Sequence, residues 1–399
     1  MKAVILSGGS EIVAAALVEE LDCAGIPVAV ISLGGNSILR RALSGLLYAE
    51  IAWPPPSAEA AAGRLLHILR GWGVRESEYC TIFPTEDGGL RLLLEQSKRL
   101  KSVAAFGQAR SLRMGGLDKA ELFECLYQRG CADLIAPTRA VESSWQAIEA
   151  IDSMECECVV KPALKPLSMQ LAGMPAKAFM TDQFRRRDDL ERALTAAWSI
   201  SSRWVVQPRL RTPPSGEAVF WGVRDRHGDL TGMAAAERWK QPRSGGSGCW
   251  VTSTNALISE LQPRAQRILE AIDFIGMCEL PFLIDSNGQW RLLELNPRPW
   301  LQVGLAAAAG APLAGMTYRI LQGDGVEAIQ PRDGVNWVNL ERLLIAAWSG
   351  EQGNRHGALL KACNVWRRAD TLAIYSSHLP YVKIRWLGRM AYKALERTW

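Results

Sequence analysis

The chain has 399 residues, of which 48% are hydrophobic, and a formal net charge of +5. A chain of this length has room for two or three domains, and its apolar runs fall short of the roughly eighteen residues that a membrane helix requires, which excludes an integral membrane protein. The nine cysteines and four histidines are scattered without disulfide or zinc spacing, and the modest charge gives no indication of nucleic acid as a partner. These features favour a reduced, cytoplasmic protein.

The first element expected is a β-α-β unit. Residues 1–7 read as an apolar strand that runs into a Gly-Gly-Ser turn at 8–10, a helix is expected over 11–24, and 26–32 read as a second strand. The turn lacks the G-x-G-x-x-G spacing of dinucleotide-binding domains, and Ser32 stands where an acidic ribose ligand would follow the second strand. An NAD-dependent oxidoreductase is therefore the weaker interpretation.

A capped helix is expected after Asp118, because aspartate is a favoured N-cap and the apolar positions that follow repeat at helical spacing (Leu122, Phe123 and Leu126). Two short apolar strands come next in the chain. Residues 158–162 (CVVKP) form the first and contain Lys161, and residues 204–210 (WVVQPRL) form the second and contain Gln207.

A cationic segment lies beyond these strands. A strand-turn-strand pattern around Gly228 and Asp229 leads to Arg238, Lys240 and Arg243, which stand before a Gly-rich loop. Such cations suit a triphosphate or an anionic substrate, although a solvated basic edge of a sheet is the alternative.

The most informative stretch is Cys278–Trp300. Its pattern predicts two strands joined by a Ser-Asn-Gly turn at 286–288, and alternation along the second strand places Glu294, Asn296 and Arg298 on one face. A carboxylate and an amide oxygen suit a magnesium ion that also holds phosphates, and a guanidinium can bind a phosphate or acyl phosphate with two donors. The stretch predicts a nucleotide site, and the alternative is a solvated hairpin face.

Taken in this order, the motifs from Met1 to Tyr318 resemble the ATP-grasp superfamily, which includes biotin carboxylase, carbamoyl phosphate synthetase and D-alanine:D-alanine ligase. The segment LLELNPR after a hairpin is the most specific match. The resemblance implies an ATP-grasp fold of mixed α/β and α+β class. Its expected parts are an N-terminal parallel α/β domain over 1–112, an ATP-grasp domain over 113–320 with a mobile lid at about 156–210, and a C-terminal extension over 321–399.

The resemblance also implies roles for single residues. The residues implied to bind ATP are Lys119, Lys161, Gln207, Glu217, Arg238, Lys240 and Glu294. Among them, Gln207 is expected at the adenine edge and Glu217 at the ribose or adenine end, where a solvated turn glutamate is the alternative. Lys161 and Arg298 are the expected catalytic cations, because they would neutralise phosphate charge.

Magnesium is expected on Glu294 and Asn296, but the place of the family's first metal carboxylate is occupied by Pro281. Glu279 lies two positions earlier on the same strand face, so it is expected to reach the ion. The alternative is an ion held by fewer protein oxygens and by more phosphate and water oxygens. The lid segment 163–180 also departs from the family, because it lacks a Ser/Gly-rich loop and has only Ser168 and Gly173. Its Lys165 and Lys177 are expected to contribute charge instead.

The activity implied is that of an ATP-dependent ligase, with ATP and Mg²⁺ as cofactors, which joins an amino acid or small acid to an amine through an acyl phosphate. A nucleotide-binding homologue without turnover is the alternative, motivated by Pro281. The loop 83–87 resembles one that borders the substrate, so Glu86 and Asp87 either meet an amino group or remain solvated. Residues 365–399 interleave basic and aromatic residues, which favours a docked terminal helix over a membrane-surface or partner-binding segment. The oligomeric state does not follow from the sequence, and a homodimer stays open.

Overall fold

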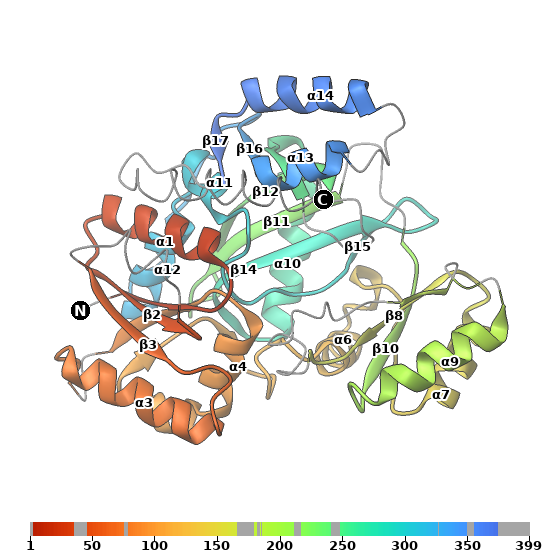
Figure 1. Cartoon of the computed structure of the whole chain (residues 1–399), viewed down its shortest axis with the longest axis horizontal. Coiled ribbons are helices and arrows are strands. Elements are labelled where there is room, and N and C mark those ends of the chain that lie inside the picture. The colour runs from red at the N-terminus through yellow and green to blue at the C-terminus, as the bar shows by residue number, and fades with distance from the viewer. Residues whose placement is uncertain are drawn as a thin grey trace, which may run out of the picture.

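The computed structural model places three bodies side by side, with a large sheet between an N-terminal sheet and a small lid-like sheet (Figure 1). The residues that it describes are 3–35, 46–75, 79–165, 179–181, 184, 186–210, 217–240, 248–325, 327–348 and 355–373. None of the helices among them is both long enough and apolar enough to cross a bilayer.

The N-terminal sheet is parallel, with strand order β3-β2-β1-β4-β5. Its strands are β1 (Ala3–Ser7), β2 (Val28–Leu33), β3 (Leu47–Ile51), β4 (Cys80–Pro84) and β5 (Ala104–Ala105). Its helices are α1 (Glu11–Cys23), α3 (Ala58–Gly71), α4 (Asp87–Glu95) and α5 (Ser97–Leu100). The β-α-β prediction for the first 33 residues is thereby confirmed.

Helices cover both faces of this sheet, which explains why β1 and β2 are apolar at nearly every position. Ala3 and Ile5 of β1 pack in one core with α1, and the alternate residues Val4 and Leu6 pack in a second core with α3 and α4. The two neighbours of β1 are β2 and β4, so the turns after β1 and β4 meet at the carboxyl edge of the sheet. A Cβ on Gly8 would lie 2.5 Å from Oε2 of Glu86, so a larger residue in this turn would require the Glu86 side chain to move.

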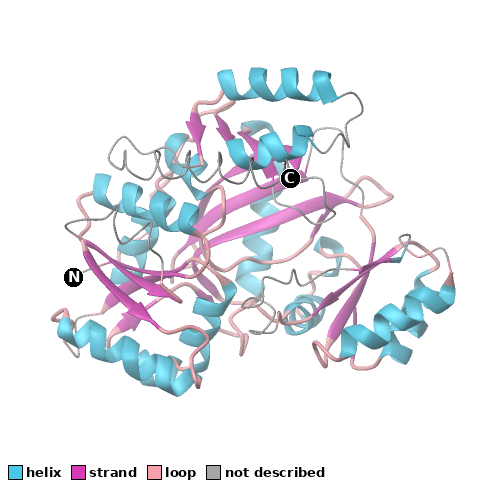
Figure 2. Cartoon of the chain, viewed as in Figure 1, coloured by secondary structure: helices cyan, strands magenta, loops and turns pink. Residues whose placement is uncertain are grey.

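The small sheet is antiparallel, with order β7-β10-β8-β9, and carries two helices on one face (Figure 2). Its elements are β7 (Arg139–Val141), α7 (Ser144–Met154), β8 (Cys158–Pro162), β9 (Phe179–Met180), α9 (Arg187–Trp198) and β10 (Trp204–Pro208). Because β7 and α7 belong to it, this body extends upstream of the predicted lid range. Before it in the chain lie β6 (Gln108–Ala109), α6 (Lys119–Gln128) and η1 (Ala132–Leu134).

The large sheet has the order β15-β14-β11-β12-β13-β16-β17, and β6 pairs with β14. Its strands are β11 (Glu217–Arg224), β12 (Leu230–Lys240), β13 (Gly248–Ser253), β14 (Phe274–Ile284), β15 (Trp290–Leu292), β16 (Asn336–Val338) and β17 (Thr371–Leu372). Its helical elements are η3 (Asn255–Leu257), α10 (Ile258–Ala271), α11 (Val303–Ala308), α12 (Leu313–Gln322), α13 (Leu340–Trp348) and α14 (Arg355–Arg367).

Strand β14 separates a core face from a cleft face. Leu280 and Phe282 pack in a core with α10, so alternation turns Glu279 and Pro281 to the other side. The predicted hairpin is confirmed, with a turn in which Gly288 has a φ of +77°.

The second strand of this hairpin is shorter than predicted. It ends at Leu292, so the prediction that Glu294, Asn296 and Arg298 continue a regular strand is wrong. The amide of Leu293 donates to Pro281 O, and the next pair is Asn296 with Glu279. Between these two pairs, two residues of the segment after β15 stand opposite one residue of β14. This local bulge directs the following side chains into the cleft.

A buried contact joins the N-terminal body to α12. Oε1 of Glu20, on α1, accepts hydrogen bonds from the backbone amides of Ala314 (2.6 Å) and Gly315 (3.0 Å) in the first turn of α12. Burial raises the pKa of Glu20 to about 7, although these two donors oppose the shift. At the other end of the chain, α14 ends at Arg367, and the rest of the basic aromatic segment beyond Ala373 lies outside the described residues.

Candidate active site

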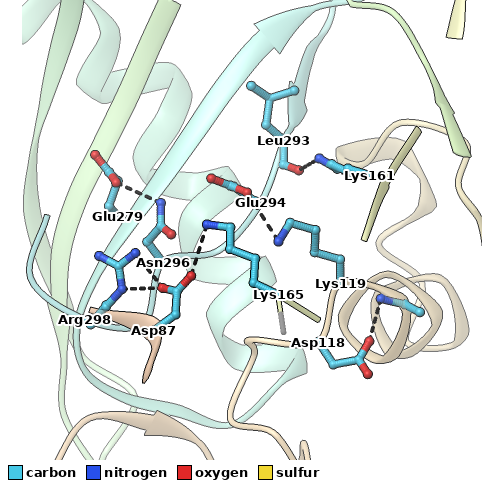
Figure 3. A network of polar contacts seen from close by, with 11 residues as sticks. Asp87, Asp118, Lys119, Lys161, Lys165, Glu279, Leu293, Glu294, Asn296 and Arg298 are labelled. Carbon is cyan, nitrogen blue, oxygen red and sulfur yellow. Dashed lines mark hydrogen bonds and ion pairs between the residues drawn. The ribbon is translucent and has the colours of Figure 1, made fainter. Parts of the chain in front are cut away.

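Four cations from three parts of the chain converge on the cleft between the bodies (Figure 3). They are Lys119, Lys161, Lys165 and Arg298, which we call the cation cluster. Lys119 comes from the start of α6, Lys161 from β8, Lys165 from the turn after β8 and Arg298 from the segment after β15. Glu294 and Asp87 lie among them.

Lys119 is the first residue of a capped helix. Oδ1 of Asp118 accepts hydrogen bonds from the amides of Ala120 (2.9 Å) and Glu121 (3.1 Å), which confirms the predicted N-cap. The Lys119 amide donates to Ala163 O at 2.8 Å, which fixes the helix start against the end of β8. Its Nζ lies 3.7 Å from a carboxylate oxygen of Glu294. Burial lowers the pKa of Lys119, and Glu294 opposes that shift.

Lys161 reaches from the small sheet to the large one. Its Nζ donates to the backbone carbonyl of Leu293 at 3.0 Å. Burial lowers the pKa of Lys161 to about 8, Glu294 partly offsets this, and Lys119 and Lys165 lower it further. A buried ammonium of this kind gains from an anion that enters the cleft.

For Glu294 the neighbouring charges, and not burial, decide the pKa. Burial would raise its pKa, but the ammonium groups of Lys119, Lys165 and Lys161 outweigh burial and lower the pKa to about 2. The carboxylate is therefore ionised throughout the physiological range.

Arg298 and Lys165 share one carboxylate, that of Asp87. Oδ1 of Asp87 accepts from Nε of Arg298 at 2.6 Å, and Oδ2 accepts from Nζ of Lys165 at 3.1 Å. Burial would raise the pKa of Asp87, but Arg298, Lys165 and Lys119 hold it well below its usual range. From the sequence, Asp87 was expected in a loop, where it would either meet an amino group of the substrate or remain solvated. Its position directly after a strand of the parallel sheet was the signal that could have placed it in the cleft.

Glu279 and Asn296 form the other side of the cleft. They face each other across an isolated antiparallel bridge, and Nδ2 of Asn296 donates to Oε2 of Glu279 at 2.9 Å. The indole of Trp221 donates to Oε1 of Glu279 at 3.2 Å. Burial, together with the nearby Glu237, raises the pKa of Glu279 to about 8.

The chemistry of this side fits a hard cation. Two carboxylates and an amide oxygen, from Glu279, Glu294 and Asn296, lie close together (Figure 3), and such oxygens are the ligands that magnesium takes. In the described part of the chain, no three His, Cys, Asp or Glu side chains are arranged to hold a metal by themselves. An ion here would therefore need further oxygens from phosphates or water.

The remaining predicted residues lie around this centre. Gln207 is buried on β10, where Nε2 donates to Oγ1 of Thr138 at 2.8 Å. Glu217, at the start of β11, lies near enough to Lys161 to raise its pKa. Arg238 is exposed at an irregularity of the β12–β13 pairing.

Some predicted residues cannot be placed in the cleft. Lys240 ends β12, and its side chain lies outside the described part of the structure, as does all of Arg243. In the lid segment, Ser168, Gly173 and Lys177 also lie outside the described residues.

A family model described as "Carbamoyl-phosphate synthase L chain, ATP binding domain" matches residues 223–329. No curated protein gives a significant match. The matched segment contains Glu279, Glu294, Asn296 and Arg298, so the match in sequence falls on the cleft described above.

Solved structures resemble most of the chain. An N5-carboxyaminoimidazole ribonucleotide synthetase in complex with ADP has a TM-score of 0.64 at 14% identity over 92% of this chain and 97% of its own. Biotin carboxylase from Campylobacter jejuni has a TM-score of 0.63 at 14% identity over 84% and 74%. L-amino acid ligase from Bacillus licheniformis has a TM-score of 0.57 at 11% identity over 82% and 75%. The resemblance seen in the sequence is thus confirmed, and the chain has the ATP-grasp fold.

Proposed function

We propose that this protein is an ATP-dependent ligase that joins a carboxylic acid to an amine. The observation that carries the proposal is the convergence of Lys119, Lys161, Lys165 and Arg298 on Glu294 and Asp87 in one cleft. Phosphoryl transfer needs little covalent chemistry from a protein, because catalysis comes from positioning and from neutralising the charge on the phosphoryl oxygens. A cluster of buried cations meets that need.

In the proposed reaction, an oxygen of the substrate carboxylate attacks the γ-phosphorus of ATP, and ADP leaves. The amine then attacks the acyl carbon, and inorganic phosphate leaves as the amide forms. Lys119, Lys161 and Arg298 neutralise the phosphate oxygens, and the closed cleft keeps water from the acyl phosphate. No nucleophilic side chain is required by this scheme.

Magnesium would be held by Glu294, Asn296 and Glu279, with the triphosphate supplying further oxygens. When bound, the ion neutralises charge on the phosphoryl group that is transferred. Gln207 and Glu217 are proposed contacts at the adenosine end, and Arg238 and Lys240 at the triphosphate. The ADP complex of one similar enzyme and the amino acid ligase among the similar structures support a nucleotide and an amino acid or small acid as substrates.

The test is ADP and phosphate release from Mg-ATP across pools of amino acids and small carboxylic acids, with and without amines. We expect release that depends on one pool and falls by at least about 100-fold in Lys161→Ala. The matched control is Lys98→Ala, since Lys98 is exposed on α5, and it should release ADP like the wild type. A pool-dependent release that survives Lys161→Ala would contradict the assignment.

A second candidate is a nucleotide-binding protein without turnover. It is favoured by one observation, namely that Pro281 stands on the cleft face of β14 and provides no carboxylate. Binding of Mg-ATP by calorimetry, without ADP release in any pool, would support this candidate over the ligase.

A further inference from the structure

Asp87 joins two bodies of the molecule at the cleft, in a way that the sequence motifs do not assign. It is the first residue of α4 in the N-terminal body, and it contacts a cation from each of two distant segments. Its side chain is 15% exposed, and those of Arg298 and Lys165 are 16% and 35% exposed. The pair with Arg298 is thus largely withdrawn from water, where a charge-assisted contact is stronger than at the surface.

The contacts divide the two oxygens of Asp87 between the two cations. Oδ1 lies 2.6 Å from both Nε and Nη2 of Arg298, and Oδ2 lies 3.1 Å from Nζ of Lys165. Nη1 of Arg298 donates to the carbonyl of Pro299 at 3.0 Å. A guanidinium has five N–H donors, so these three contacts leave one on each terminal nitrogen. Among the described residues, these contacts fix the plane of the guanidinium and leave two of its donors for a phosphoryl group.

A small pocket has Asp87 in its wall together with two members of the cation cluster, and its lining residues are Asp87, Arg91, Leu117, Lys119, Leu164 and Lys165. Glu86, the neighbouring carboxylate, instead lies against the Gly8 turn. The two adjacent acids therefore have different surroundings. Of these two, Asp87 is the one that forms hydrogen bonds with members of the cation cluster in the described part of the chain.

We propose that Asp87 is a positioning residue, which orients Arg298 and Lys165 toward the phosphoryl group that is transferred. The proposal rests on the proposed function, because it concerns the same cleft. In this role Asp87 contacts no substrate. It acts through the two cations, as a carboxylate that fixes a guanidinium plane does.

The test uses Mg-ADP with and without beryllofluoride, which stands in for the phosphoryl group and needs no knowledge of the acid or amine. In Asp87→Asn the amide keeps one acceptor but loses the charge and one oxygen. We expect the affinity for Mg-ADP-beryllofluoride to fall about tenfold and that for Mg-ADP to change less than about threefold, as measured by calorimetry. A merely structural role would weaken both to the same extent.

A second variant and a matched control complete the design. Asp87→Glu keeps the charge but moves the carboxylate by one methylene, so it should show the same selective loss. Asp133→Asn removes a carboxylate from a bidentate pair with Arg267 outside the cleft, and it should leave both affinities unchanged.

Coupling to Arg298 decides the mechanism. Arg298→Gln should weaken binding of Mg-ADP-beryllofluoride much less in the Asp87→Asn background than in the wild type, because the arginine is no longer positioned. Additive losses, or wild-type affinities in both Asp87 variants, would overturn the proposal while the ligase assignment stands. If the wild-type protein binds no Mg-ADP at all, the proposed function fails and this inference fails with it.

Discussion

Glu294 and Glu279 lie on the same side of the large sheet and differ in almost every electrostatic respect. Glu294 is surrounded by lysines, which overcome the effect of burial and lower its pKa to about 2. Glu279 has neutral hydrogen-bond donors from Trp221 and Asn296, and burial and Glu237 raise its pKa to about 8. Two carboxylates in one cleft therefore favour different charge states at neutral pH.

The difference divides the cleft into two halves with different electrostatic environments. Around Glu294, positive charge is in excess, which suits a polyanion such as a triphosphate. Around Glu279, a buried acid has little compensation, so a cation that enters will be stabilised there. Groups whose environments push their pKa values apart mark a site with separate chemical roles. In the proposed ligase the cations around Glu294 would face the phosphates, and the carboxylates of Glu294 and Glu279 would face the metal.

The largest effect is expected from Glu294→Gln. The substitution keeps the size of the side chain but removes the charge that faces Lys119 and that is proposed to bind magnesium. We expect Mg-ATP turnover to fall by about 100-fold or more with the fold intact. ADP release and thermal unfolding measure the two parts of this prediction.

The control for that variant is Glu260→Gln on the exposed start of α10. It should turn over like the wild type. Full activity in Glu294→Gln would refute the metal assignment and with it the division of the cleft.

The next effect concerns Glu279→Gln. Its folded-state pKa of about 8 lies above the ordinary value of 4.5, so the free energy of unfolding falls as pH rises from about 4.5 through about 8. Glu279→Gln should remove that loss of stability. It should also weaken Mg²⁺ binding, so that turnover requires an Mg²⁺ concentration about tenfold higher. Thermal unfolding at pH 6 and pH 9, with and without Mg²⁺, tests the sign. Mg²⁺ should stabilise the wild type more at pH 9 than at pH 6. If Mg²⁺ stabilises the variant as much as the wild type at pH 9, the assignment of Glu279 to the metal is contradicted.

Local patterns were sufficient to predict the elements that carry most of the site. The cap at Asp118, the apolar strand around Lys161 and the hairpin before Glu294 all follow from spacing within a few residues. Each depends on interactions between near neighbours in sequence, which propensity and periodicity describe.

The contacts of Asp87 could not be predicted in this way. Asp87 and Arg298 are 211 positions apart, and only the packing of the N-terminal sheet against the large sheet brings them together. The early end of β15 has the same kind of cause, because the bulge beside the Glu279–Asn296 bridge depends on pairing between strands and not on residues 293–296 alone.

Glu20 offers a comparison with Glu279 outside the cleft, since burial raises the pKa of both. The folded-state pKa of about 7 for Glu20 means that stability is lost as pH rises from about 4.5 through 7. In Glu20→Gln the amide oxygen can still accept hydrogen bonds from the amides of Ala314 and Gly315. The free energy of unfolding of the variant should therefore increase relative to that of the wild type as pH rises, by about 3 kcal/mol at most. Chemical denaturation at pH 5 and pH 8 measures this. Asp22→Asn, exposed on the same helix, should show no such gain.

The smallest effect is expected from Asp118→Ala. This variant tests whether the Glu294 half of the cleft depends on the cap of the helix that carries Lys119. Loss of the two cap hydrogen bonds should cost about 1 kcal/mol in the free energy of unfolding, and Asp118→Asn should recover most of it. The amide of Lys119 also donates to Ala163 O, which holds the helix start without the cap. Mg-ATP affinity should therefore change less than about threefold. A larger loss would mean that the cap itself sets the position of the Lys119 ammonium beside Glu294.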